Sequence, residues 1–321
     1  MVCYFDRPWE DALDAAARHG LTMVEPCGGG HIPKTHYDPV ALAENSELLA
    51  RFRESLESRS LQIAALGVHG NPVHPDPTIA AAHHEDFIAT CKIASALEVG
   101  VIDVISGTPA GGPQDKTVNW IVNFIWPHFS EAYRWQWEER LIPYWKEAAH
   151  IAASYDVRIA IEPHGGSTVY NLQTFFRLYD AVGEQIGANV DPSHLFWLGI
   201  DVSEFIAELG GTIILAHAKD VGSNERLIRR DGLIPAVEFD DWDNRSWLYR
   251  AVGHGHDSVF WRNYVTSLRR AGYDGPVVIE IEEPYQTTDD AVAQSVSVMR
   301  EVLPIERMPE TNWFDKYQWK T

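Results

Sequence analysis

The sequence is short of basic residues and of cysteine, and it contains no long apolar run. Its 26 Lys and Arg stand against 46 Asp and Glu, which gives a formal net charge of −20. That charge repels phosphate backbones, so nucleic acid is not expected as a partner. The three cysteines have neither metal-binding spacing nor even pairing, which indicates reduced thiols in a cytoplasmic protein. No apolar run approaches membrane-spanning length and the first residues lack the order of a signal peptide, so we expect no membrane partner.

Short apolar runs alternate with helix-length segments along most of the chain. This alternation is typical of parallel β-α-β units. We expect strands over 1–5, 21–25, 61–67, 101–105, 157–162, 186–191, 212–217 and 276–280. Eight such units predict an α/β fold, a (β/α)8 TIM barrel over residues 1–303, followed by an aromatic C-terminal tail over 304–321. Two long segments, 106–140 and 221–256, contain several tryptophans and are expected to be aromatic loops over the C-terminal face of the barrel.

Four of the predicted strands end on side chains that bind metal ions. They are Glu162, Asp191, His217 and Glu280, on four successive strands. Neighbouring barrel strands deliver their carboxyl ends to one face, so these side chains can converge on one ion. Three carboxylates and one imidazole form a hard, mostly oxygen site, which suits Mn²⁺ or Mg²⁺ and also admits Co²⁺, Zn²⁺ or Fe²⁺. A salt bridge or a helix cap would explain one such acid, but not four.

Further polar and aromatic side chains follow the same strand ends. His69 and Asn71 follow the third predicted strand, and Lys219 lies two residues beyond His217, on the same side of its strand. We interpret these three as candidate substrate contacts. His164, two residues beyond Glu162, is a candidate catalytic base because the pKa of histidine lies near neutrality. A hydrogen-bonding role behind the ligands remains open for His164, and Lys219 could be a surface cation.

The aromatic segments are candidates for one side of a sugar-binding site. Trp126 lies in the 106–140 segment, and Trp197 follows the sixth predicted strand. The loop around Trp126 is too aromatic to be disordered, and sugar rings bind well on aromatic faces. We therefore interpret both tryptophans as candidate substrate contacts. The alternative is that the tryptophans pack the loop against itself.

At this point the chain resembles a known family, the sugar phosphate isomerase/epimerase family of xylose-isomerase-like TIM barrels. The matching motifs are IEPHGG, NVDPSHLFW, HAKD and GYDGPVVIEIEEP, with GNPVHPDP and WQWEERLIPYWKE upstream. The resemblance implies that Glu162, Asp191, His217 and Glu280 fall on the family's four metal positions. It also implies that Glu162 and Glu280 are a proton-transferring catalytic pair and that His194 contacts substrate.

The implied chemistry is metal-assisted removal of a proton next to a sugar carbonyl. Within the family, the histidine after Glu162, the aromatic loop and the tail resemble the metal-bearing alpha subunit of C-glycoside deglycosidases, which act on 3-oxo-glycosides. This resemblance favours cleavage or rearrangement of a 3-oxo-glycoside by elimination. A ketose or sugar isomerase or epimerase is the alternative. An inosose-type dehydratase, an AP endonuclease-like hydrolase and a non-catalytic sugar-binding protein rank lower.

The expected partners are a small sugar or glycoside and other subunits. An aromatic tail such as 304–321 is a liability when it is free in solvent. We therefore expect a homo-oligomer or a hetero-oligomer with a smaller subunit.

Overall fold

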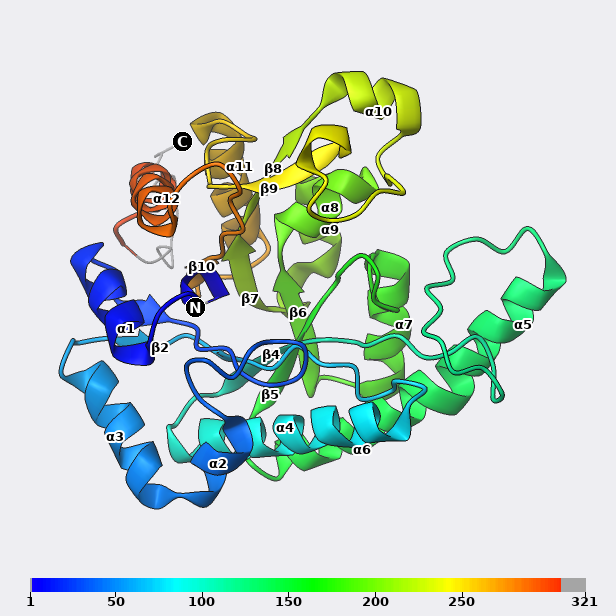
Figure 1. Ribbon diagram of the computed structural model, residues 1–321, viewed down its shortest axis with the longest axis horizontal. Helices are drawn as coiled ribbons and strands as arrows, with labels where there is room; N and C mark the ends of the chain where they lie inside the picture. Colours follow the sequence, from blue (N-terminus) through cyan, green and yellow to red (C-terminus); the bar gives the residue numbers. More distant parts are fainter. Residues whose placement is uncertain (1, 307–321) are drawn as a thin grey trace, which may run out of the picture.

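The computed structural model describes residues 2–306, which form a curled parallel sheet surrounded by helices (Figure 1). Six strands pair in the order β10-β7-β6-β5-β4-β3, and a separate pair, β1 and β2, continues the curve. Their bounds are β1 Met23–Val24, β2 Gln62–Ile63, β3 Leu66–Gly67, β4 Val101–Ile105, β5 Arg158–Glu162, β6 Ile186–Val190, β7 Ile213–Ala218 and β10 Val277–Ile279. The expected TIM-barrel fold is confirmed.

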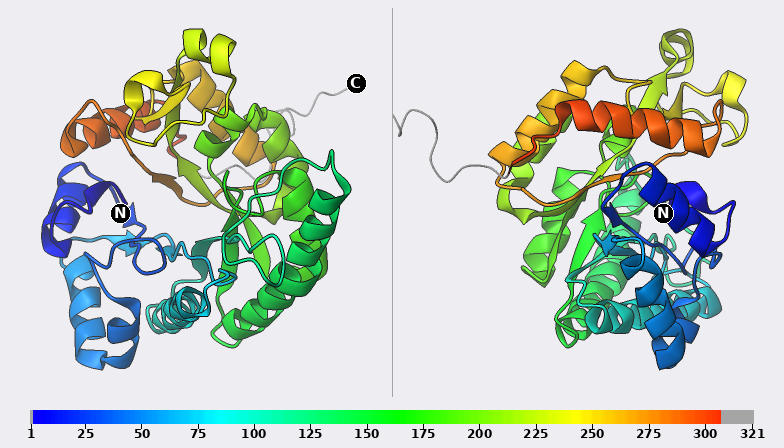
Figure 2. Two further views of the ribbon diagram at one scale, coloured as in Figure 1. Left: turned by 45° about the vertical axis from the view of Figure 1, so that its right-hand side comes forward. Right: turned by 90° about the vertical axis from the view of Figure 1, so that its left-hand side faces the viewer.

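Helices cover the outside of the sheet, as both views in Figure 2 show. They are α1 Trp9–Arg18, α2 Pro39–Glu44, α3 Ser46–Glu57, α4 Pro77–Ala96, α5 Pro127–Trp135, α6 Ile142–Ala153, α7 Leu172–Val182, α8 Pro192–Leu198, α9 Val202–Leu209, α10 Glu225–Asp231, α11 Ser258–Arg270 and α12 Thr288–Val302. With both of its faces covered, the sheet needs nearly continuous apolar strands, and β6 is buried at every position. Within residues 2–306, no helix combines the length and apolarity needed to cross a bilayer.

The first predicted strand is wrong. Residues Val2–Tyr4 form a 3₁₀ turn, and among the described residues β10 has no strand partner on the side of β1. An apolar run indicates burial but not backbone geometry, and Tyr4 is buried from the turn. The turn is fixed by His36, whose Nε2 donates to the Tyr4 carbonyl at 3.0 Å. A cavity of about 70 Å³ remains between β1 and β10.

The register of the sheet brings the predicted strand ends to one level. Ile105 at the end of β4 pairs with Glu162 at the end of β5, and His217 of β7 pairs with Val278 of β10. Asp191 directly follows β6, and Glu280 directly follows β10. The register of the backbone alone therefore places the four predicted metal ligands at the same end of the barrel.

The two long segments have different structures. The 106–140 segment includes α5 and a π-helical turn, Gln136–Leu141, and α5 projects away from the barrel (Figure 1). The 221–256 segment contains α10 and an antiparallel hairpin of β8, Asp220–Ser223, and β9, Trp247–Arg250. The hairpin follows β7 directly, so it stands at the carboxyl ends of the strands, beside α8 (Figure 1). Residues 307–321, most of the predicted tail, lie outside the described residues.

Candidate metal centre

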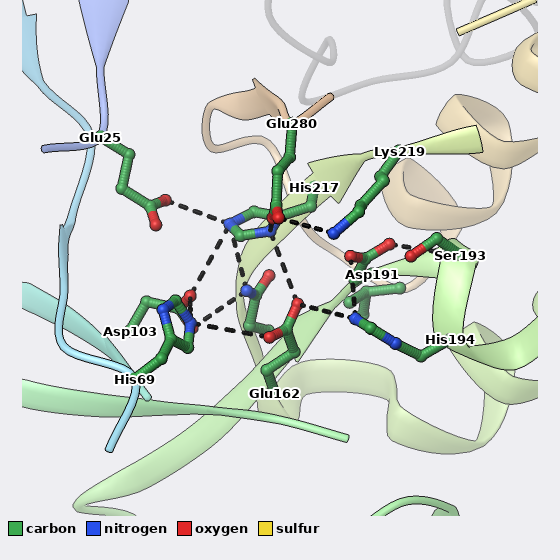
Figure 3. Close-up of polar contacts among 12 residues, drawn as sticks. Glu25, His69, Asp103, Glu162, Asp191, Ser193, His194, His217, Lys219 and Glu280 are labelled. Atoms are coloured by element: carbon green, nitrogen blue, oxygen red, sulfur yellow. Dashed lines mark hydrogen bonds and ion pairs between the residues drawn. The ribbon is translucent and has the colours of Figure 1, made fainter. Parts of the chain in front are cut away.

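The four predicted ligands meet at the carboxyl end of the sheet. Glu162, Asp191, His217 and Glu280 each offer one ligand atom, and these atoms all lie within 4.8 Å of one another. Figure 3 shows the four side chains pointing toward a common point from β5, β6, β7 and β10. Glu280 keeps 14% of its side chain exposed, while the other three are almost fully buried. The group is therefore reached from solvent on the Glu280 side.

Three of these four residues carry a buried polar atom without a hydrogen-bond partner. The atoms are Glu162 Oε1, Asp191 Oδ2 and His217 Nδ1. A buried polar atom left unpaired costs free energy, so most native structures satisfy it. A divalent cation at this point would satisfy all three atoms at once, and three oxygen donors with one nitrogen suit such an ion. The residues present therefore fit a metal ion.

The remaining atoms of the ligands are held by the protein. Asp191 caps α8, because its Oδ1 accepts from the Ser193 backbone N–H at 2.8 Å and leaves Oδ2 for the cluster. His217 Nε2 lies 3.1 Å from Glu25 Oε2, so Nδ1 is the nitrogen that faces Glu162 and Glu280. A carboxylate behind a ligand histidine fixes its tautomer and ring orientation.

The carboxyl groups in the cluster are in very different electrostatic states. Burial, and then the neighbouring Asp103 and Asp191, raise the pKa of Glu162 well above its usual range. Burial raises the pKa of Asp191 to about 6, against the lowering effect of the Lys219 ammonium. Burial would also raise the pKa of Glu280, but Lys219 and His217 outweigh it and hold that pKa well below the usual value. A cation at the centre would favour the ionised forms of all three acids.

A second group of polar residues lies beneath the ligands, and of its members sequence reasoning had singled out only His69. Asp103, in the middle of β4, is fully buried and accepts from His69 Nε2 at 2.9 Å and from Asn189 Nδ2 at 3.0 Å. Glu25 completes the group through His217. The available signal was a polar residue inside an apolar run, as in Val-Ile-Asp-Val-Ile and Ile-Gly-Ala-Asn-Val. Such a residue in a buried strand needs a partner in the barrel interior.

The predicted substrate residues divide into those beside the cluster and those away from it. His69 Nε2 lies 3.6 Å from Glu162 Oε2, and His194 Nε2 lies 3.5 Å from Asp191 Oδ2. The rings of His164 and His194 are 3.8 Å apart between centroids. Lys219 is buried, and its ammonium contacts Glu280 at 2.6 Å and Glu282 at 2.5 Å. The structure therefore brings together His69, His164, His194 and Lys219.

Asn71, Trp126 and Trp197 have other surroundings. Asn71 is hydrogen-bonded through both side-chain atoms to the backbone of Thr108, and so holds the loop after β4. Trp126 is 60% exposed at the start of α5, on the helix that projects away from the barrel (Figure 1). Trp197 is buried and stacks on Trp247 of β9 at 4.9 Å, in one cluster with Tyr249. The structure does not bring Trp126 together with the ligands.

Comparisons with known proteins agree with this architecture. Residues 13–302 match the family described as "Xylose isomerase-like TIM barrel". The uncharacterized protein YfiH of Bacillus subtilis strain 168 is 36% identical over 299 residues, covering 92% of this chain and 95% of that protein. Among solved structures, the IolI protein with a bound zinc atom has a TM-score of 0.63 at 16% identity, covering 92% and 93% of the two chains.

D-psicose 3-epimerase from Clostridium cellulolyticum H10, solved with D-tagatose, has a TM-score of 0.58 at 15% identity, covering 93% and 96% of the two chains. At these identities the likeness to the two solved structures concerns the fold alone. The family match, in contrast, covers most of the chain, and the Bacillus protein is similar over almost its full length. This chain therefore belongs to the xylose isomerase-like TIM barrel family.

Proposed function

We propose that this protein is a divalent-metal-dependent enzyme that removes a proton from the carbon next to a sugar carbonyl. The observation that carries the proposal is the convergence of Glu162, Asp191, His217 and Glu280, with unpaired buried atoms on the first three. A divalent ion held there would supply Lewis acidity, which makes the proton beside the carbonyl more acidic. Mn²⁺ is our first choice because the donors are mostly carboxylate oxygens, with Mg²⁺, Co²⁺, Zn²⁺ or Fe²⁺ as alternatives.

Glu280 and Glu162 are proposed as the proton-transferring pair. They lie on either side of His217, whose Nδ1 is 3.1 Å from Glu280 Oε2 and 3.6 Å from Glu162 Oε1. Lys219 keeps Glu280 ionised, so Glu280 can accept a proton. Glu162, 3.6 Å from the same imidazole nitrogen, is the second carboxyl group and can return a proton once it has taken one up.

His164 is proposed to contact substrate as a hydrogen-bond acceptor, in place of the catalytic base that we expected, because its pKa is low. Its Nδ1 lies 2.6 Å from the Gly165 carbonyl, which can only accept, so Nδ1 carries the hydrogen and Nε2 is left with its lone pair. Burial and the Lys219 charge lower the pKa of His164 to about 4, where we expected a value near neutrality. His164 is therefore neutral at pH 7 and suited to accept a hydrogen bond from a sugar hydroxyl.

A 3-oxo-glycoside is the proposed substrate, cleaved by elimination of its aglycone. Trp197, Trp247 and Tyr249 form a buried aromatic cluster, and the Tyr249 hydroxyl lies 3.3 Å from His194 Nδ1. Trp197 and Trp247 cover each other's faces, so the cluster forms an apolar wall beside His194, and such a wall favours a substrate that carries an apolar second ring. The alternative is a ketose isomerase or epimerase. The placement of Glu162 and Glu280 around the same nitrogen of His217 favours this alternative, and so does the likeness to D-psicose 3-epimerase.

Metal content and isotope exchange test the proposal together. Elemental analysis is expected to find one equivalent of a divalent metal in the wild type and a loss of metal in Glu280→Gln. Incubation of the metal-loaded protein in D₂O with a 3-oxo-glycoside, followed by NMR, is expected to show aglycone release. Deuterium incorporation with an epimerised or isomerised sugar would instead support the alternative.

The matched control is Glu225→Gln, which removes the same charge from an exposed residue of α10. This variant is expected to keep both metal and activity. A wild type that holds no metal after reconstitution, or that exchanges no proton with either substrate class, contradicts the proposed function.

A further inference from the structure

Arg245 is a buried cation without an acidic partner. Only 7% of the residue is exposed, and none of the carboxylates in residues 2–306 forms an ion pair with it. Among the described residues, its one side-chain hydrogen bond runs from Nε to the Trp247 carbonyl at 3.4 Å. Buried Lys219 differs, because it contacts Glu280 and Glu282, and even the half-buried Arg250 contacts Glu283 at 2.8 Å. A buried charge is normally paired, so Arg245 calls for an explanation.

Two aromatic rings hold the Arg245 guanidinium in place. Its central carbon lies 4.5 Å from the centroid of the Trp247 ring and 4.9 Å from that of Phe239. Stacking of this kind uses the flat faces of a guanidinium, while its N–H groups point outward in the plane and stay free for hydrogen bonds. The arrangement fixes the orientation of the guanidinium without neutralising its charge.

Arg245 lines a pocket on the β8–β9 hairpin. The pocket measures about 350 Å³, and its lining includes Ser223, Arg245, Arg250 and His254. The lining also includes Asp243, and Arg250 is already paired with Glu283, so Arg245 is the lining guanidinium that has no ion pair within residues 2–306. In a chain with a net charge of −20, a buried guanidinium left without a carboxylate is a local exception to the overall charge.

We propose that this pocket binds a small oxyanion, the carboxylate or phosphate group of a small molecule, at a site separate from the metal centre. A planar guanidinium with its edge free is the group that pairs best with such an anion, through two parallel N–H···O bonds. Trp247 separates the two sites, because it packs on Arg245 from one side and on Trp197 from the other. The inference does not depend on the proposed function of the metal centre.

Calorimetric titration of the full-length protein tests the site, with inorganic phosphate and acetate as separate probes. Whichever probe binds more tightly identifies the preferred anion class. Arg245→Gln is expected to weaken binding at least about tenfold, the loss expected for a hydrogen bond to a charged group. Arg229→Gln is the matched control, because Arg229 is 73% exposed on α10 and its replacement removes the same charge. Its binding is expected to match the wild type.

A second variant covers the case in which Arg245→Gln fails to fold. Ser223→Glu places a carboxylate in the pocket from an exposed position and is expected to abolish anion binding while the thermal unfolding midpoint stays near that of the wild type. The proposal is overturned if neither probe binds the wild type. It is also overturned if a folded Arg245→Gln or Ser223→Glu binds as the wild type does, or if Arg229→Gln loses binding equally.

Discussion

Replacing Glu25 with glutamine tests whether the carboxylate behind His217 sets the metal affinity. Glu25 is 3% exposed, and its Oε2 lies 3.1 Å from His217 Nε2, on the opposite side of the ring from the cluster. Glu25 and His217 also affect each other's ionisation, since His217 lowers the pKa of Glu25 and Glu25 raises the pKa of His217, both against burial. The variant keeps the size of the side chain but removes the charge that orients the imidazole.

The expected loss follows from the role of the carboxylate. Residues that hydrogen-bond to a ligand histidine typically change metal affinity by about 10- to 100-fold, which corresponds to about 1.4–2.8 kcal/mol. The upper part of this range applies to Glu25→Gln, because the His217–Glu25 contact is buried and no water can replace the lost charge. Glu280→Gln removes a ligand outright and is expected to lose more.

The assay is a competition titration of Mn²⁺ against a chelator at pH 7.5, with wild type, Glu25→Gln and Glu25→Asp. We expect Glu25→Asp to recover part of the affinity, since it restores the charge at a longer distance. A merely structural role would lower the unfolding midpoint of both variants without separating their metal affinities. Equal affinities in the wild type and a folded Glu25→Gln would refute the reasoning.

Three further predictions concern pH, the buried lysine and the tail. Metal affinity is expected to fall by at least about tenfold from pH 7 to pH 5, because protonation of Asp191, with its pKa of about 6, competes with the ion. Protonation of Glu162 and His217, whose pKa values are also raised, adds to this loss, and a flat profile in the chelator titration would contradict it. Lys219→Met removes the main charge that lowers the pKa of Glu280. The acid limb of the pH–rate profile is therefore expected to move to higher pH. If the limb does not move, Glu280 is not the base whose titration the profile reports. Deletion of 308–321 is expected to lower the molecular mass in solution by light scattering, and an unchanged oligomer would exclude the tail as a subunit contact.

The ligand set could be predicted because its signal is local. A short apolar run that stops on an acid or a histidine reveals both the strand and the place of the side chain at its end, as in Arg158–Glu162 and Ile213–Ala218. The same local signal misled at residues 1–5, because burial of Tyr4 and partial burial of Cys3 do not specify an extended backbone. Residues 39–57 form two helices, α2 and α3, because the Asn45 side chain caps α3 through the Glu47 and Leu48 N–H groups.

The positions of the aromatic residues could not be predicted in the same way. Trp126 and Trp197 both follow strands in the sequence, yet one is exposed on α5 and the other stacks inside the hairpin cluster. Their positions depend on the way in which the long loops fold back onto the barrel. That folding is set by contacts between residues that are far apart in the sequence. The partner of Trp197 is Trp247, fifty residues away along the chain.

The sequence by itself determined the barrel class and the four metal-type side chains, because strand periodicity and strand ends are properties of neighbouring residues. Only the tertiary structure placed Asp103 and Glu25 beneath the ligands, since they come from strands that meet inside the barrel. It also placed Arg245 between two rings, with no carboxylate of residues 2–306 in an ion pair with it. Which buried charges pair depends on which helices and strands pack together. Such packing brings together segments that are far apart in the sequence, so no local sequence pattern predicts the pairing.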